Sequence, residues 1–144
     1  MSKTFITTKI VNAYPMQALQ AEFKGYRTND VPSETAGYEV IYEDGYKSWC
    51  PKHIFERNAI EFRDLDYFNH KCQDNYPDHI KQMFNEESEL LNKINKLRDF
   101  INSDKFNDLN NYQQNTSIKQ HTFMLGYLNV LRERIIYEIS IPVE

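Results

Sequence analysis

The chain has 144 residues and a formal net charge of −4 at pH 7, with a pI near 5.6. This length suits one domain or two very small ones. Ten Tyr and nine Phe raise the aromatic share to 14%, so a core can be filled by few side chains. Lys and Arg are scattered among acids rather than gathered in a basic stripe, so we expect no polymeric DNA or RNA partner.

The sequence also bears on where the protein acts. No stretch approaches the roughly 18 apolar residues of a membrane span, so no membrane partner is expected. Residues 1–7 lack the apolar core of a signal peptide. Cys50 and Cys72 lie far apart and form no C-x-x-C motif. A cytoplasmic protein with two reduced thiols is the simplest expectation.

The N-terminal part is expected to be rich in β-structure. Residues 5–11 contain several β-branched side chains and predict a strand. One or two helical turns are expected over residues 16–24, ended by Gly25. Residues 28–35 have the composition of a loop, with Asn, Asp, Pro and Ser.

The strongest local signal is a β-hairpin over residues 38–49. Two strand-like runs flank Asp44–Gly45, a dipeptide that suits a two-residue type I′ turn. A turn of that length pairs Val40 with Trp49 and places both on the face expected to be buried. Pro51 then suits the first position of a short helix, because that position needs no backbone N–H.

The C-terminal part predicts an antiparallel pair of helices. Residues 63–77 are polar and are interpreted as a linker between a β-rich module over residues 1–62 and a helix pair over residues 78–140. Apolar residues at three- and four-residue spacing predict both helices, the second from about Thr116 to Ile139. The expected fold class is α+β: a small β-rich module with a hairpin and short helix, followed by an α-helical hairpin.

The second helix has more apolar residues than a single partner helix needs. A partner helix needs one apolar stripe about 100° wide. A further apolar set lies off that stripe: Phe123, Tyr127, Val130 and Tyr137. This surplus indicates packing against either the N-terminal module or another copy of the chain. Since two helices alone make a thin core, we expect a homo-oligomer formed through the C-terminal helices.

No catalytic or metal-binding constellation is evident. Cys50 beside His53 could form a thiolate pair, but a half-buried structural cysteine is the simpler interpretation. His70, Cys72 and His79 form the only cluster of possible metal ligands, without the paired spacing of zinc sites. We therefore expect no enzyme, no metal and no cofactor. Two sets of carboxylates are interpreted as solvated faces: Glu39, Glu43 and Asp44 in the hairpin, and Glu86, Glu87 and Glu89 in the first long helix.

Tyrosine and tryptophan residues next to cations indicate a possible ligand surface in the N-terminal module. The candidate ligand-binding residues are Tyr14, Tyr26, Arg27, Tyr46, Trp49 and Lys52. Aromatic rings stack on nucleotide bases and cations bind phosphate, so this combination suits a small nucleotide. The alternative is that the rings form the core and the cross-strand pairs of the hairpin.

Two stretches resemble bacteriophage proteins. Residues 37–56 match the pattern G-Y-x-V-x-Y-x-D-G-Y-x-S-W-x-P-K-x-x-F-E, which is typical of a recurring module in small phage proteins. Residues 86–134 resemble a helical-pair family related to a crAss-like phage product. The matching positions are Lys93, Lys96, Leu97, Phe100, Ile101, Ser103, Phe106, Leu109, Met124, Tyr127, Leu131 and Arg134. The two halves commonly occur fused in this order, and this chain departs from the pattern at residues 57–60.

The resemblance implies a phage accessory protein without implying a mechanism. Small phage proteins of this kind include sponges that sequester the nucleotide signals of bacterial immunity, an analogy of size and genome context. The leading hypothesis is therefore an anti-defence protein in the host cytoplasm that binds a cyclic or modified nucleotide without catalysis. The alternative is a protein–protein inhibitor or adaptor that acts on a host defence protein through the helical hairpin.

Overall fold

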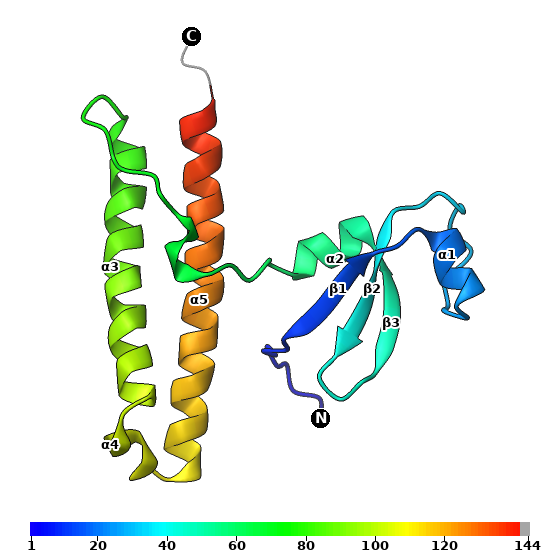
Figure 1. The fold of residues 1–144 in the computed structure, drawn as a ribbon, viewed down its shortest axis with the longest axis horizontal. Helices are drawn as coiled ribbons and strands as arrows, with labels where there is room; N and C mark the ends of the chain where they lie inside the picture. The colour runs from blue at the N-terminus through cyan, green and yellow to red at the C-terminus, as the bar shows by residue number, and fades with distance from the viewer. Residues whose placement is uncertain (142–144) are drawn as a thin grey trace. The chain divides into compact units, whose positions relative to one another are not determined.

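The computed structural model describes residues 1–141, which divide into two compact units (Figure 1). The first unit is Met1–Ala59, and the second begins at Ile60. A three-stranded antiparallel sheet forms the first unit and long helices form the second. The α+β fold class expected from the sequence is confirmed.

The sheet of the first unit has the strand order β1-β2-β3. Its strands are β1 (Val11–Pro15), β2 (Gly37–Tyr42) and β3 (Lys47–Pro51), and both pairings are antiparallel. The strand expected over residues 5–11 is displaced, because pairing with β2 begins only at Val11, opposite Tyr42. Residues 1–10 contain no strand, and Phe5 is 76% exposed. β-branched composition alone does not make a strand without a partner to pack against.

The hairpin between β2 and β3 is confirmed, but the expected register is wrong by one residue. Trp49 lies opposite Glu39, and Val40 lies opposite Ser48. The backbone N–H of Tyr42 donates to the Tyr46 carbonyl at 2.9 Å, so three residues form the loop instead of two. A shift of one residue moves every side chain to the other face. Trp49 and Val40 therefore lie on opposite faces of the sheet.

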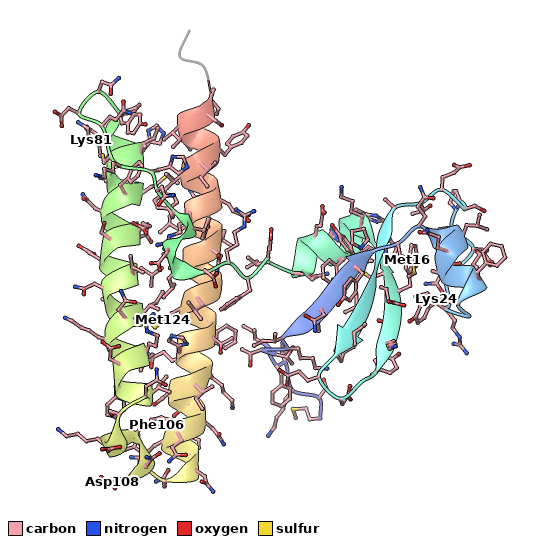
Figure 2. All side chains as sticks on the ribbon, in the orientation of Figure 1. Met16, Lys24, Lys81, Phe106, Asp108 and Met124 are labelled. Atoms are coloured by element: carbon pink, nitrogen blue, oxygen red, sulfur yellow. The ribbon has the colours of Figure 1, made fainter. Side chains whose placement is uncertain are left out.

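One face of the sheet packs against α1 (Ala18–Phe23). Trp49 is buried with Ala18 and Ala21 of this helix, and its indole N–H donates to the Met16 carbonyl at 2.8 Å. Figure 2 labels Met16 at the start of this region. Gly37 lies directly against the indole ring, where a Cβ atom would clash. Trp49 thus anchors the short helix to the sheet.

The opposite face of the sheet carries Tyr38 and Val40. Val40 is only 3% exposed. The helix α2 (Lys52–Asn58) begins directly after Pro51, as the sequence predicts. Its Phe55 ring lies 4.8 Å from the Tyr38 ring, measured between centroids. The two faces of the small sheet therefore each have a helix packed against part of them.

The second unit is built on two antiparallel helices, α3 (Asp78–Ile101) and α5 (Asn111–Ser140), which lie side by side (Figure 1). Helix α5 begins earlier than expected because Asn110 and Gln113 form a reciprocal capping box. The connection contains α4 (Asp104–Asn107), whose Phe106 is 8% exposed (Figure 2). Buried side chains between the helices form two clusters: Ile80, Met83, Phe84, Leu131 and Ile135, and Ile94, Leu125 and Leu128.

Residues 63–77, expected to be a linker, pack against this helix pair. They contain a 3-10 helix, η1 (Leu65–Tyr67). Leu65 packs on one buried cluster, and Phe68 and Tyr76 pack on the other. The few apolar side chains in this polar segment are enough to hold it, so it forms part of the second unit. Within residues 1–141, no helix combines the length and apolar character needed to cross a membrane.

Candidate functional site

An open groove lies on the second unit where η1 meets the helix pair. Its volume is about 610 Å³, within the range of small-molecule sites. The segment before and through η1 forms one wall, with Arg98 of α3 and two residues of α5 completing it. The lining residues are Phe62, Arg63, Asp64, Leu65, Asp66, Tyr67, Arg98, His121 and Leu125. The groove thus combines two arginines, two aspartates and a histidine with aromatic rings.

A buried arginine on α5 fixes the wall of this groove. Arg132 is 2% exposed, and its Nε and Nη2 lie 2.9 and 2.8 Å from Oε1 of Glu87 on α3. Its Nη1 donates to the Leu65 carbonyl at 2.8 Å. The guanidinium carbon lies 5.4 Å from the Tyr67 ring centroid and 5.1 Å from the Phe68 ring centroid. Arg132 therefore joins both long helices to η1.

The interpretation of Glu39 and Glu87 as parts of solvated faces is wrong. Glu39 is only 8% exposed and accepts hydrogen bonds from Tyr26 and Lys24. Glu87 is only 6% exposed, because it lies between α3 and α5 and accepts a hydrogen bond from Arg132. A buried carboxylate is tolerated when a cation and hydrogen bonds compensate for the lost water. The partner lies 45 residues away in the sequence, so helical spacing on α3 alone could not identify it.

The two arginines of the groove, Arg63 and Arg98, are only partly engaged in interactions within the protein. Arg63 donates to Glu61 at 3.1 and 3.3 Å, and its guanidinium carbon lies 5.1 Å from the Tyr67 ring centroid. The side chain of Arg98 is 46% exposed and lies 3.9 Å from Asp99. Such an exposed ion pair is worth little, so the Arg98 guanidinium can turn to another anion at small cost.

Two polar atoms of the groove residues are buried without a hydrogen-bond partner among the described residues. These atoms are the Tyr67 hydroxyl and His121 Nε2. Burial raises the pKa of Tyr67, while burial and, secondarily, Arg98 lower the pKa of His121. Both groups are therefore favoured in their neutral, hydrogen-bonding forms. A buried polar atom without a partner requires an explanation, and a bound polar ligand is one.

Of the six residues predicted from the sequence, Tyr26 and Trp49 contribute to the core of the first unit. Trp49 is 8% exposed, and Tyr26 packs against the same cluster. The Tyr26 hydroxyl donates to Glu39 at 2.7 Å, and Lys24 Nζ lies 3.2 Å from the same oxygen. The Tyr26 hydrogen bond, assisted by Lys24, holds the pKa of Glu39 below its usual range.

The other four residues predicted from the sequence are exposed: Tyr14, Arg27, Tyr46 and Lys52. Tyr14 lies opposite Glu39 in the sheet, and Glu39 lies opposite Trp49, so the three occupy one cross-strand row. Tyr46 is 63% exposed beside the hairpin loop. Lys52 Nζ lies 3.9 Å from Glu56 of the same helix. The structure brings Tyr14, Tyr26 and Trp49 to one face and places Tyr46 and Lys52 near the two ends of β3.

The cysteine and histidine candidates remain separate. Burial raises the pKa of the Cys50 thiol, which disfavours the thiolate needed for nucleophilic attack. Cys72 is exposed, and His79 Nε2 lies 3.8 Å from Glu138 on α5. Among residues 1–141, no three His, Cys, Asp or Glu side chains gather in a way that could hold a metal ion.

Four groove residues were not predicted from the sequence: Arg63, Tyr67, Arg98 and His121. Arg63 and Tyr67 lie in the segment interpreted as a linker, and Arg98 and His121 lie on the two long helices. One usable signal was the sequence Arg63-Asp-Leu-Asp-Tyr-Phe68, in which aromatic and cationic residues interrupt a polar run.

The helical hairpin contains a stretch that matches a family model. Residues 77–137 match the model of a protein family described as Sequestin. This stretch spans α3, α4 and most of α5, and it contains the groove residues Arg98, His121 and Leu125. No curated protein and no solved structure matches the chain significantly.

Proposed function

We propose that this protein binds and sequesters a small nucleotide-type ligand without converting it. The observation that carries the proposal is the groove of the second unit, where cations, rings and unpartnered polar atoms converge. The similarity of residues 77–137 to Sequestin supports a sequestering role, since the name describes such an activity. By its resemblance to phage proteins, we infer an anti-defence role in the host cytoplasm.

The groove residues divide into groups suited to different parts of a nucleotide. Arg63 and Arg98 would bind phosphate oxygens through charge-assisted hydrogen bonds. Phe62 is 64% exposed, which leaves its ring free to stack on a base. The Tyr67 hydroxyl and His121 Nε2 are closed off from solvent, so each would gain the hydrogen bond that it lacks when the ligand opens the wall of the groove.

Sequestration fits this lining better than catalysis does. The groove lining contains no Ser, Thr or Cys side chain that could act as a nucleophile. The phenol of Tyr67 is favoured in its protonated form, because burial raises its pKa. These groups are suited to holding a ligand through hydrogen bonds and charge.

The N-terminal residues predicted from the sequence remain a second location for the ligand: Tyr14, Tyr26, Arg27, Tyr46, Trp49 and Lys52. In this location, exposed Tyr14 or Tyr46 would stack, and Arg27 or Lys52 would bind phosphate. Trp49 and Tyr26 would then act by supporting the sheet from its core.

The alternative function is inhibition of a host protein through the helical hairpin. Its specific support is the exposure of the four surplus apolar side chains of α5, which ranges from 37% for Val130 to 67% for Tyr137. These side chains are Phe123, Tyr127, Val130 and Tyr137. Large exposed apolar patches often mark protein interfaces.

The proposal is tested by ligand recovery. The purified protein is incubated with cyclic dinucleotides, cyclic trinucleotides and linear nucleotides, washed, denatured by heat, and the supernatant is analysed by mass spectrometry. We expect one nucleotide class to be recovered chemically intact and in stoichiometric amount. Recovery of an altered nucleotide would indicate an enzyme. Recovery of none, together with a host protein captured by the chain, would support the inhibitor instead.

A further inference from the structure

Helix α5 is apolar on two opposite sides. At 100° per residue, the buried side chains of Leu125, Leu128 and Ile135 lie on one side. A second set of residues recurs at three- and four-residue spacing on the opposite side. It consists of four apolar residues with one lysine and one arginine, and we name it the outer stripe: Lys119, Phe123, Tyr127, Val130, Arg134 and Tyr137. The α3–α5 packing uses the first side and leaves the outer stripe exposed.

The outer stripe exposes enough apolar surface to form the centre of an interface. Phe123, Tyr127 and Tyr137 are 46%, 49% and 67% exposed. At about 200 Å² for each side chain, they leave roughly 300 Å² of aromatic surface open on each copy. Two copies would bury about twice that, and flanking side chains along the helix would bring the contact toward the roughly 1,200 Å² of a specific interface.

A shallow hollow lies within the same stripe. It has a volume of about 330 Å³ and is lined by Val130, Glu133, Arg134, Tyr137 and Glu138. Phe123 projects from the stripe about three turns toward the helix N-terminus. Each copy therefore has an exposed ring, Phe123, and a hollow on the same face of α5. In a two-fold contact, the ring of each copy can enter the hollow of the other.

The sequence of the stripe is complementary to itself in the antiparallel direction. When two α5 helices cross with the two-fold axis between Leu128 and Asn129, Phe123 of one copy faces Arg134 in the hollow of the other. The same register places Tyr127 opposite Val130. It also places Lys119 at the same height as Glu138, which lies beside the stripe and lines the hollow, so a cation can reach an acid at each end of the contact.

We propose that two copies of this chain associate through the outer stripes of α5, packed antiparallel about this axis. The four long helices of the two copies then form one layer in the order α3, α5, α5, α3, because the outer stripe lies on the side of α5 opposite α3. This assembly goes beyond the proposed ligand binding and does not depend on it. It commits the outer stripe to a second copy, whereas the inhibitor hypothesis would leave the stripe for a host protein.

The face is tested by sedimentation of the full chain over a hundredfold concentration range. We expect a dimer for the wild type and a monomer for Phe123→Lys, because that substitution removes the ring and places a second cation opposite Arg134 of the other copy. Ile118→Lys is the matched control, since Ile118 is 47% exposed on the same helix but off the stripe. The control is expected to remain a dimer. Far-UV circular dichroism verifies that each variant is folded, and Tyr127→Lys replaces Phe123→Lys if that variant unfolds.

The register is tested by charge reversal at the two ends of the contact. Lys119→Glu and Glu138→Lys each place like charges opposite one another. Each is expected to weaken the dimer by a few-fold, and the double variant is expected to restore it. A wild type that stays monomeric, or a Phe123→Lys variant that stays dimeric, would overturn the proposed face. Single reversals that weaken the dimer without restoration in the double variant would overturn the register.

Discussion

Within the second unit, Arg132 of α5 contacts two separate parts of the chain, α3 and the segment around η1. Its guanidinium reaches Glu87 of α3 and the Leu65 carbonyl of η1, while Tyr67 and Phe68 lie beside it. Removal of one partner from a buried ion pair leaves an uncompensated charge, which costs about 3–5 kcal/mol. We therefore expect Arg132→Met to lower the free energy of unfolding by about that amount in urea titrations.

A second variant separates the charge from the packing. Arg132→Met combined with Glu87→Leu removes both charges, so part of the lost stability should return. Lys96→Ala, an exposed substitution on α3, serves as the control and should change stability by less than about 0.5 kcal/mol. If the double variant is no more stable than Arg132→Met alone, the lost stability reflects contacts of Arg132 other than its pairing with Glu87.

His121 gives the second unit a pH dependence whose direction follows from its environment. Burial, with Arg98 as a smaller cause, lowers its pKa from the ordinary value of 6.5. The unfolded chain therefore takes up this proton at higher pH than the folded chain does. The contribution of His121 to stability is present above about pH 6.5 and is lost as the pH falls through the lowered pKa.

The measurement is the free energy of unfolding between pH 7 and pH 5. We expect the wild type to lose stability over this window and His121→Gln to lose less, since glutamine has no proton to bind. Equal pH dependence in the two proteins would show that His121 carries its proton equally well in both states.

At the scale of elements, the packing of β2 against Trp49 depends on a missing side chain. A Cβ atom on Gly37 would clash with the indole ring and would lie 2.6 Å from the Cys50 carbonyl oxygen. Gly37→Ala is expected to destabilise the first unit by about 1–3 kcal/mol, because backbone would have to move. Thermal unfolding followed by Trp49 fluorescence measures this loss directly, since the chain has one tryptophan.

Gly126→Ala is the matched control for this glycine substitution. A Cβ atom at Gly126 would meet no atom within 4 Å, and the residue lies inside α5. Alanine is a better helix former than glycine by about 1 kcal/mol. Gly126→Ala should therefore leave stability unchanged or raise it. A Gly37→Ala protein as stable as the wild type would contradict the close packing of β2 on the ring.

The sequence predicted the hairpin and both long helices because each carries a local signal. Turn residues between strand-like runs mark the hairpin, and apolar residues at three- and four-residue spacing mark the helices. The register of the hairpin could not be read in the same way. Asp44–Gly45 is also compatible with a three-residue loop that has Gly45 at positive φ, here +88°, and only the packing of Trp49 decides between the two.

The groove could not be predicted, since it depends on contacts between residues far apart in the sequence. Arg132 meets Leu65 across 67 positions and Glu87 across 45. No local pattern links these residues, and the polar composition of residues 63–77 suggested a linker. The surplus apolar residues of α5 were found from the sequence because helical periodicity alone separates one face from the other.

At the scale of the whole molecule, the division into two units predicts that the second can fold alone. The buried clusters around α3 and α5 draw on residues from Leu65 onward. A fragment of residues 60–144 is therefore expected to keep a helical far-UV circular dichroism spectrum and cooperative unfolding. An unfolded fragment would mean that the first unit contributes stability that these clusters do not supply.

The groove of the second unit is proposed to bind the ligand. Substitution of one arginine in the groove and one outside it tests this proposal most directly. Equilibrium dialysis against the nucleotide recovered from the wild-type protein compares Arg98→Ala, in the groove, with Arg27→Ala, in the first unit. Loss of a charge-assisted hydrogen bond costs about 1.5–3 kcal/mol, so we expect Arg98→Ala to bind at least about tenfold more weakly. Arg27→Ala should bind as the wild type does. Unchanged binding by Arg98→Ala, with binding lost in Arg27→Ala, would contradict the groove and place the ligand on the first unit.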